Sequence, residues 1–101
     1  MGFGNLAKMA QQMQADMARV EQELVDLRLE GSSGGGAVRA VVSGKQDLIS
    51  LTIDPEVVDP EDVEMLQDLI VAAVGDALHQ ARRTAEEKLS RVTGGLRIPG
   101  L

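Results

Sequence analysis

The sequence predicts an α+β fold in the order α-β-β-β-α, with a small antiparallel sheet between two long helices. Apolar residues recur every three or four positions over residues 6–27 and again over residues 63–92. Between these segments they alternate within short runs rich in valine and isoleucine. Spacings of this kind are the main local signals for helices and strands. At 101 residues, the chain is expected to form one domain with a modest core, which favours pairing with a second copy.

The first helix is predicted over residues 6–27 from a heptad pattern of apolar side chains. Its members, spaced alternately four and three residues apart, are Leu6, Ala10, Met13, Met17, Val20, Leu24 and Leu27. A stripe this narrow suits packing against another helix. We expect part of it to form a dimer interface, made by Leu6, Met13, Met17, Val20 and Leu24.

A short strand is predicted over residues 27–30, where apolar and charged residues alternate. The glycine-rich segment 31–36 then predicts a flexible loop. Gly31 and Gly36 have the spacing of a phosphate-binding P-loop, but Ala37-Val38 stands where that motif requires Lys followed by Ser or Thr. We therefore interpret the segment as a loop and not as a nucleotide site.

Two further strands are predicted over residues 37–43 and 47–53, joined by a hairpin turn at Ser43-Gly44-Lys45-Gln46. In the second of them, Ile49, Leu51 and Ile53 are expected on one face. Asp54-Pro55 ends this strand, because proline lacks the N–H that a strand ladder needs.

The second helix is predicted to start at Asp59 as N-cap, with Pro60 in its first turn. Apolar residues recur through Val92, and Gly94-Gly95 and Pro99 are expected to stop it. About 33 residues at 1.5 Å each would span roughly 50 Å, whereas a compact domain of this size has a radius of gyration near 13 Å. Both helices are therefore expected to project as arms from the same side of the sheet.

Charge is segregated along the chain, although the net charge is −6. Residues 1–46 hold five acids and five bases, residues 47–76 hold nine acids and no base, and residues 77–101 hold five bases and two acids. A local basic stripe matters more to a polyanion than the overall sum. Two interpretations of this stripe stay open here: solubility charges on a helix surface, or contacts with phosphates.

The residues offer no candidate for catalysis, a cofactor or a metal. The chain has no cysteine, and its only histidine, His79, lacks a second imidazole with which to share a metal. Glu61, Glu64 and Asp68 are expected to be a solvated helix start that favours the helix dipole. Phe3 is the only aromatic residue, which disfavours stacking on single-stranded nucleic acid. We expect no enzyme, no small-molecule substrate, no signal peptide and no membrane segment.

Several short segments follow one another in a distinctive order, nearly end to end. They are Asn5-Leu6-Ala7-Lys8, Gln11-Gln12-Met13-Gln14, Glu30-Gly31, Val41-Val42-Ser43-Gly44, Leu51-Thr52-Ile53-Asp54-Pro55, the segment 62–77, and Thr93-Gly94-Gly95-Leu96-Arg97-Ile98-Pro99-Gly100. Together they resemble the YbaB/EbfC family of bacterial nucleoid-associated proteins. The chain is thus expected to be a single YbaB/EbfC-like domain over residues 1–101, with residues 1–5 and 94–101 as flexible ends.

The resemblance implies a tweezer-like homodimer, with helical arms projecting from a joined sheet. It also implies a cytoplasmic protein of the nucleoid that binds double-stranded DNA with little sequence specificity and contributes to nucleoid organisation and gene regulation. DNA contact is carried over to the basic positions on the matching helices and tail, which are Lys8, Arg82, Arg83, Lys88, Arg91 and Arg97. The alternative hypothesis is a non-enzymatic adaptor or scaffold that holds another protein with its helical arms.

Overall fold

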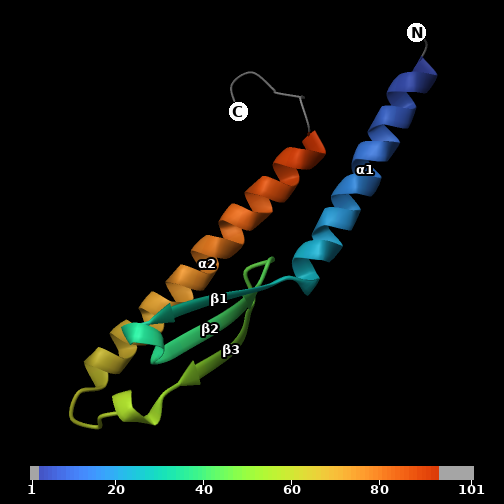
Figure 1. The fold of residues 1–101 in the computed structure, drawn as a ribbon. Helices are drawn as coiled ribbons and strands as arrows, with labels where there is room; N and C mark the ends of the chain where they lie inside the picture. The colour runs from blue at the N-terminus through green and yellow to red at the C-terminus, as the bar shows by residue number, and fades with distance from the viewer. Residues whose placement is uncertain (1–2, 94–101) are drawn as a thin grey trace.

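Two long helices and a three-stranded sheet make up the fold of the computed structural model, which describes residues 3–93 (Figure 1). In chain order the elements are α1 (Phe3–Asp26), β1 (Arg28–Ser33), β2 (Val38–Ser43), β3 (Leu48–Ile53) and α2 (Val63–Thr93), with short 3-10 turns at Gly34–Gly36 and Pro55–Val57. The strands are antiparallel in the order β1-β2-β3. The predicted α-β-β-β-α order is confirmed.

The core lies between α2 and one face of the sheet. Its fully buried side chains are small and come from two rows, namely Val38, Ala40 and Val42 of β2 and Ala73, Ala77 and Ala81 of α2. The first row has the two-residue period of a strand face, and the second has the four-residue step of a helix face. Alanines on the helix let its backbone come close to the strands.

Gly31 belongs to β1, so the prediction of a loop over residues 31–36 is wrong for its first three residues. Gly31 pairs with Ala40 of β2. A Cβ at residue 31 would lie 2.3 Å from Ala77 N and 2.4 Å from Ala73 O. Glycine is needed here because α2 rests on the strand backbone, a tertiary reason that composition does not reveal. The turn is confined to Gly34, Gly35 and Gly36, all with positive φ.

A β-bulge in β3 changes the face that was predicted for Ile49. Val41 lies opposite Ser50 and Val42 lies opposite Leu48, so Ile49 is the extra residue. Leu48 therefore takes the position beside buried Val42 that uninterrupted alternation assigns to Ile49. Leu51 keeps its predicted place, opposite Ala40.

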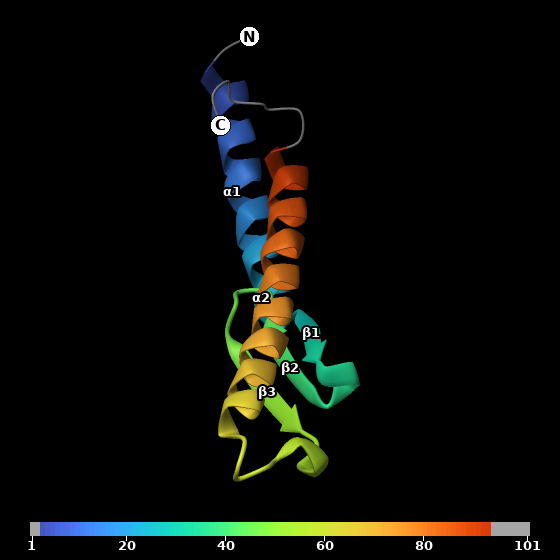
Figure 2. The same ribbon diagram turned by 90° about the vertical axis from the view of Figure 1, so that its left-hand side faces the viewer.

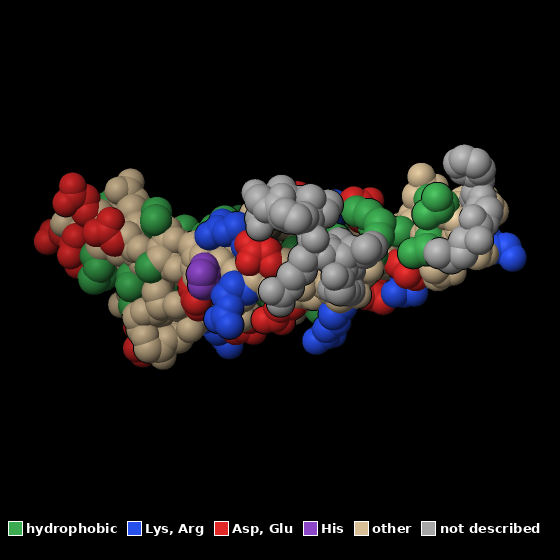
Figure 3. Space-filling view, turned by 90° about the horizontal axis from the view of Figure 1, so that it is seen from above, with side chains coloured by type: hydrophobic (Ala, Val, Ile, Leu, Met, Phe, Trp, Pro, Cys, Tyr) green, Lys and Arg blue, Asp and Glu red, His purple; other side chains and the backbone are tan. Residues whose placement is uncertain are grey.

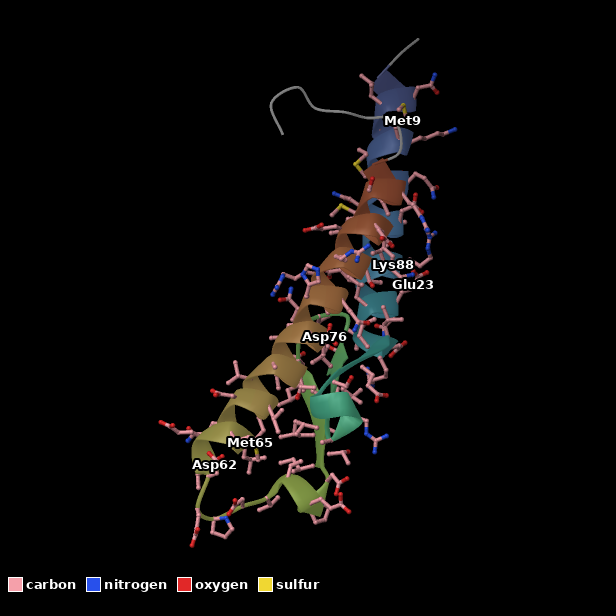
Figure 4. All side chains as sticks on the ribbon, turned by 60° about the vertical axis from the view of Figure 1, so that its left-hand side comes forward. Met9, Glu23, Asp62, Met65, Asp76 and Lys88 are labelled. Atoms are coloured by element: carbon pink, nitrogen blue, oxygen red, sulfur yellow. The ribbon has the colours of Figure 1, made fainter. Side chains whose placement is uncertain are left out.

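Both helices begin elsewhere than the sequence predicts. α2 starts at Val63 and its N-cap is Asp62, whose Oδ1 accepts a hydrogen bond of 3.2 Å from Met65 N (Figure 4). Asp59, the predicted cap, accepts instead from Glu61 N at 2.9 Å and closes the turn before the helix. α1 starts at Phe3, so residues 3–5, assigned to a flexible end, are helical. The predicted stop at Gly94-Gly95 and Pro99 lies outside the described residues.

The molecule is elongated, with extents of 71 × 27 × 16 Å and a radius of gyration of 19.5 Å. The N-terminal part of α1 and the C-terminal part of α2 extend beyond the sheet on the same side (Figures 1 and 2), which confirms the two predicted arms. At their base, the β2–β3 turn fixes α1, since a Cβ at Gly44 would lie 2.9 Å from Leu24 Cα. Within residues 3–93, no helix has the length and hydropathy of a membrane span.

Candidate nucleic-acid interface

The C-terminal half of α2 carries three arginines. Arg82, Arg83 and Arg91 are exposed. None of them forms an ion pair with another residue in the range 3–93. Arg83 and Arg91 line one surface depression together with Glu86, Glu87 and Ser90. These guanidinium groups are therefore available to an anion from solution.

Helix geometry turns Arg83 away from the sheet. At 100° per residue, Arg83 lies about 200° around α2 from Ala81, whose side chain is fully buried in the core. Arg82 and Arg91 lie on the flanks, about 100° and 80° from Ala81 in opposite directions. The arginines thus spread over the part of α2 that the core leaves uncovered, where a large rigid ligand can reach them.

Lys88 differs from the arginines because it already has a partner. Its Nζ donates to Glu23 Oε2 of α1 at 3.1 Å, across the gap between the two arms (Figure 4). Its side chain is only 26% exposed, against 44% for that of Glu23. The structure thus places Lys88 between the arms rather than on their outer surface.

Arg19 joins Lys88 and Arg91 in this gap, and sequence reasoning did not identify it. A hollow of about 320 Å³ between the helices is lined by Asp16, Arg19, Val20, Glu23, Lys88, Arg91 and Val92. Arg19 Nη1 lies 3.0 Å from Asp16 Oδ1, and Arg19 Nε lies 3.7 Å from Glu23 Oε1. The spacing of three and four residues signals ion pairs along one helix. The spacing does not reveal that α2 lies opposite Arg19 in the fold.

Lys8 is exposed but lies apart from the other basic residues of the described range 3–93. Lys8 precedes Arg19 by 11 residues, so Lys8 lies about 17 Å closer to the free end of α1. Lys88 and Arg91 face Arg19, so the basic stripe of α2 is not side by side with Lys8. Arg97 lies outside the described residues.

The acidic residues between the end of β3 and the start of α2 occupy the opposite end of the molecule. Figure 3 shows acidic side chains gathered at that end, with lysine and arginine side chains further along the helices. Several carboxylates of the acidic segment 47–76 have structural partners: Asp54 Oδ1 accepts from Glu56 N at 3.0 Å, and Asp76 Oδ2 accepts from Ser32 N at 3.2 Å. Among residues 3–93, no group of three or more His, Cys, Asp or Glu side chains could hold a metal ion.

The residues expected at a dimer interface differ in how far they are exposed to solvent. Val20 and Leu24 are 3% and 4% exposed, so their apolar surface is already covered within one protomer. Met13 is half-buried, whereas Met17 and Leu6 are exposed. A second apolar surface lies on the edge strand β3, where Leu48, Ile49 and Leu51 are all exposed. The sequence places these three in a strand, but does not show that the strand is an edge.

Comparisons with known proteins agree with this geometry. A model of the YbaB/EbfC DNA-binding family matches residues 1–96. A nucleoid-associated protein of Acetivibrio thermocellus is 55% identical over 105 aligned positions, covering 99% of this chain and 93% of the relative. A nucleoid-associated protein of Moorella thermoacetica is 50% identical and covers 99% of both chains. The crystal structure of the uncharacterized protein HP0035 from Helicobacter pylori has the same fold, with a TM-score of 0.81 at 24% identity over 93% of this chain and 99% of that one.

Proposed function

Because the chain belongs to the YbaB/EbfC DNA-binding family, we propose that it binds duplex DNA through its helical arms with little sequence specificity. In this proposal it acts in the bacterial nucleoid, within the cytoplasm, and contributes to nucleoid organisation and gene regulation. The observation that carries it is the set of exposed arginines on α2, Arg82, Arg83 and Arg91, which form no ion pair within residues 3–93. Lys8, Lys88 and Arg97 are proposed to extend these contacts.

The proposed contacts are with phosphates more than with bases. Arginine and lysine bind phosphate oxygens, and such contacts fix a protein on the duplex without reading its sequence. The chain has one aromatic residue, so stacking on unpaired bases contributes little. Binding is therefore expected to weaken steeply with salt and to vary little between sequences.

The net charge of −6 is compatible with this function because a large group of acids, between the end of β3 and the start of α2, lies far from the arginines of α2. Asp62 caps the start of α2, and Arg83 lies 21 residues later, which is about 32 Å along the helix. The Debye length at physiological ionic strength is about 8 Å, so the acidic end is largely screened from the arms. The arginines of α2 can therefore bind phosphates although the overall charge is negative.

We also propose that the protein is a homodimer joined at the sheet. β3 is an edge strand with exposed apolar side chains, and an unpaired edge of this kind favours pairing with another strand. A second copy there would leave the arms of both protomers free for one duplex. The other candidate surface is the part of the α1 stripe formed by exposed Leu6 and Met17 and half-buried Met13.

Binding to two unrelated labelled duplexes, followed by fluorescence anisotropy, tests the proposed function. We expect similar dissociation constants, micromolar or tighter at low salt. Absence of binding to both duplexes at low salt would contradict the proposal. It would favour the adaptor function. Leu6 and Met9 of α1 are 65% and 59% exposed and offer a suitable protein-contact surface, and Met9 lies near the free end of the helix (Figure 4).

A further inference from the structure

We propose that the hollow between α1 and α2 is a seat for a DNA phosphate, and that the Glu23 carboxylate occupies this seat when DNA is absent. The inference rests on the proposed function and adds two features to it. Arg19 becomes a phosphate-binding residue. Glu23 becomes the residue that competes with the phosphate for the cations of the seat.

Three cationic side chains from two helices meet at this hollow. Arg19 comes from α1, and Lys88 and Arg91 come from α2. A volume of about 320 Å³ is ample for a phosphate group with water around it. Among the described residues, Arg91 forms no ion pair. One of the three cations is therefore already free to receive a phosphate oxygen.

Glu23 holds the other two cations at once. Its Oε2 accepts from Lys88 Nζ at 3.1 Å, and its Oε1 lies 3.7 Å from Arg19 Nε. Asp16 also forms an ion pair with the Arg19 guanidinium, with its Oδ1 at 3.0 Å from Nη1. Two carboxylates thus face three cations, and the lining carries one net positive charge.

A carboxylate in this position acts against DNA in two ways. It repels an incoming phosphate, and it neutralises cations that would otherwise release counterions from the duplex. Glu23 also joins the arms at their base, because Glu23 is on α1 and Lys88 is on α2. DNA binding would exchange this carboxylate for a phosphate and leave Arg19, Lys88 and Arg91 around it.

The matched pair of variants Glu23→Gln and Glu21→Gln tests the seat. Glu21 is on the same helix and pairs with Lys45 at 3.4 Å, outside the hollow. Both substitutions remove one negative charge and one lysine ion pair, so they raise the net charge equally. We expect Glu23→Gln to bind a labelled duplex about fivefold more tightly than Glu21→Gln, the effect of removing one charge at about 4 Å in water. Its log–log salt slope should be steeper by about 0.9 for each cation released.

Asp16→Asn is the second variant, because it leaves the Glu23–Lys88 contact between the arms in place. It should also bind DNA more tightly than Glu21→Gln, whether or not the loss of Glu23 loosens the arms. If wild type and Glu21→Gln bind DNA while Glu23→Gln and Asp16→Asn bind no better than Glu21→Gln, the phosphate seat is wrong and the proposed function stands. If no variant binds the duplex at low salt, both are wrong.

Discussion

Gly31 of β1 lies directly against the backbone of Ala77 of α2, so closely that a Cβ at residue 31 would come within 2.3 Å of Ala77 N. This contact sits in the middle of the core, between Ala73 and Ala81, whose side chains are fully buried. It fixes the distance between α2 and the sheet, and through α2 it positions the arm that carries the arginines.

Gly31→Ala should destabilise the fold by about 3 kcal/mol, because the new methyl group meets backbone atoms that cannot move away individually. Gly75→Ala is the control, since nothing lies within 4 Å of its added Cβ and alanine favours a helix over glycine. That variant should be unchanged or up to about 1 kcal/mol more stable. Chemical unfolding at fixed protein concentration measures both, and equal tolerance of the two substitutions would contradict the close approach.

Asp62→Ala should cost about 1 kcal/mol, because it removes the side chain that accepts from Met65 N at the start of α2. Asp59→Ala should cost less, since Asp59 closes a turn outside the helix. Thermal unfolding compares the two variants. A larger loss for Asp59→Ala would restore the helix start that the sequence predicts.

Charge reversal of Arg83 and Arg91 should weaken DNA binding at least about tenfold, since two phosphate contacts are lost in each protomer and replaced by repulsion. The loss should be similar for unrelated duplexes, because phosphates carry no sequence information directly. The control is Arg39→Glu with Lys45→Glu, which changes the net charge by the same amount on β2 and its turn, away from α2. An equal loss in the control would show that overall charge, and not the arm, governs binding.

Ile49→Lys should convert the proposed dimer into monomers. Ile49 is the extra residue of the β-bulge and is 49% exposed, so lysine there adds a charge to the edge of β3 without entering the core. Met17→Lys places the same charge on the exposed stripe of α1 and should leave the dimer intact. Sedimentation analysis distinguishes them, and dissociation by Met17→Lys alone would assign the interface to α1.

The sequence was sufficient for the kind and order of the helices and strands, because their apolar spacing is a local property. It also pointed to Arg82, Arg83 and Arg91, whose clustering is visible without a structure, and their contact with DNA stays a prediction. Helix length alone predicted arms that extend past the sheet, since the second helix is too long for one small domain to cover.

The features that the sequence missed all depend on distant parts of the chain. Gly31 resembles the loop glycines that follow it, and only its contact with Ala77 explains its place in a strand. The bulge at Ile49 requires the β2 partner, which local alternation does not contain. Arg19 acquires its proposed role only because α2 returns alongside α1 and brings Lys88 and Arg91 close to it. Asp59 and Asp62 are both good caps, and the choice between them depends on how the chain turns before α2.

The salt dependence of DNA affinity tests the central claim most directly. If the arms of a dimer neutralise about four to six phosphates, a plot of log affinity against log salt should have a slope near −4 to −5 for wild type on any duplex. A slope of this size, equal for two unrelated sequences, is the result we expect. A slope near zero, or no binding even at low salt, would contradict a protein that holds DNA through phosphate contacts on its arms.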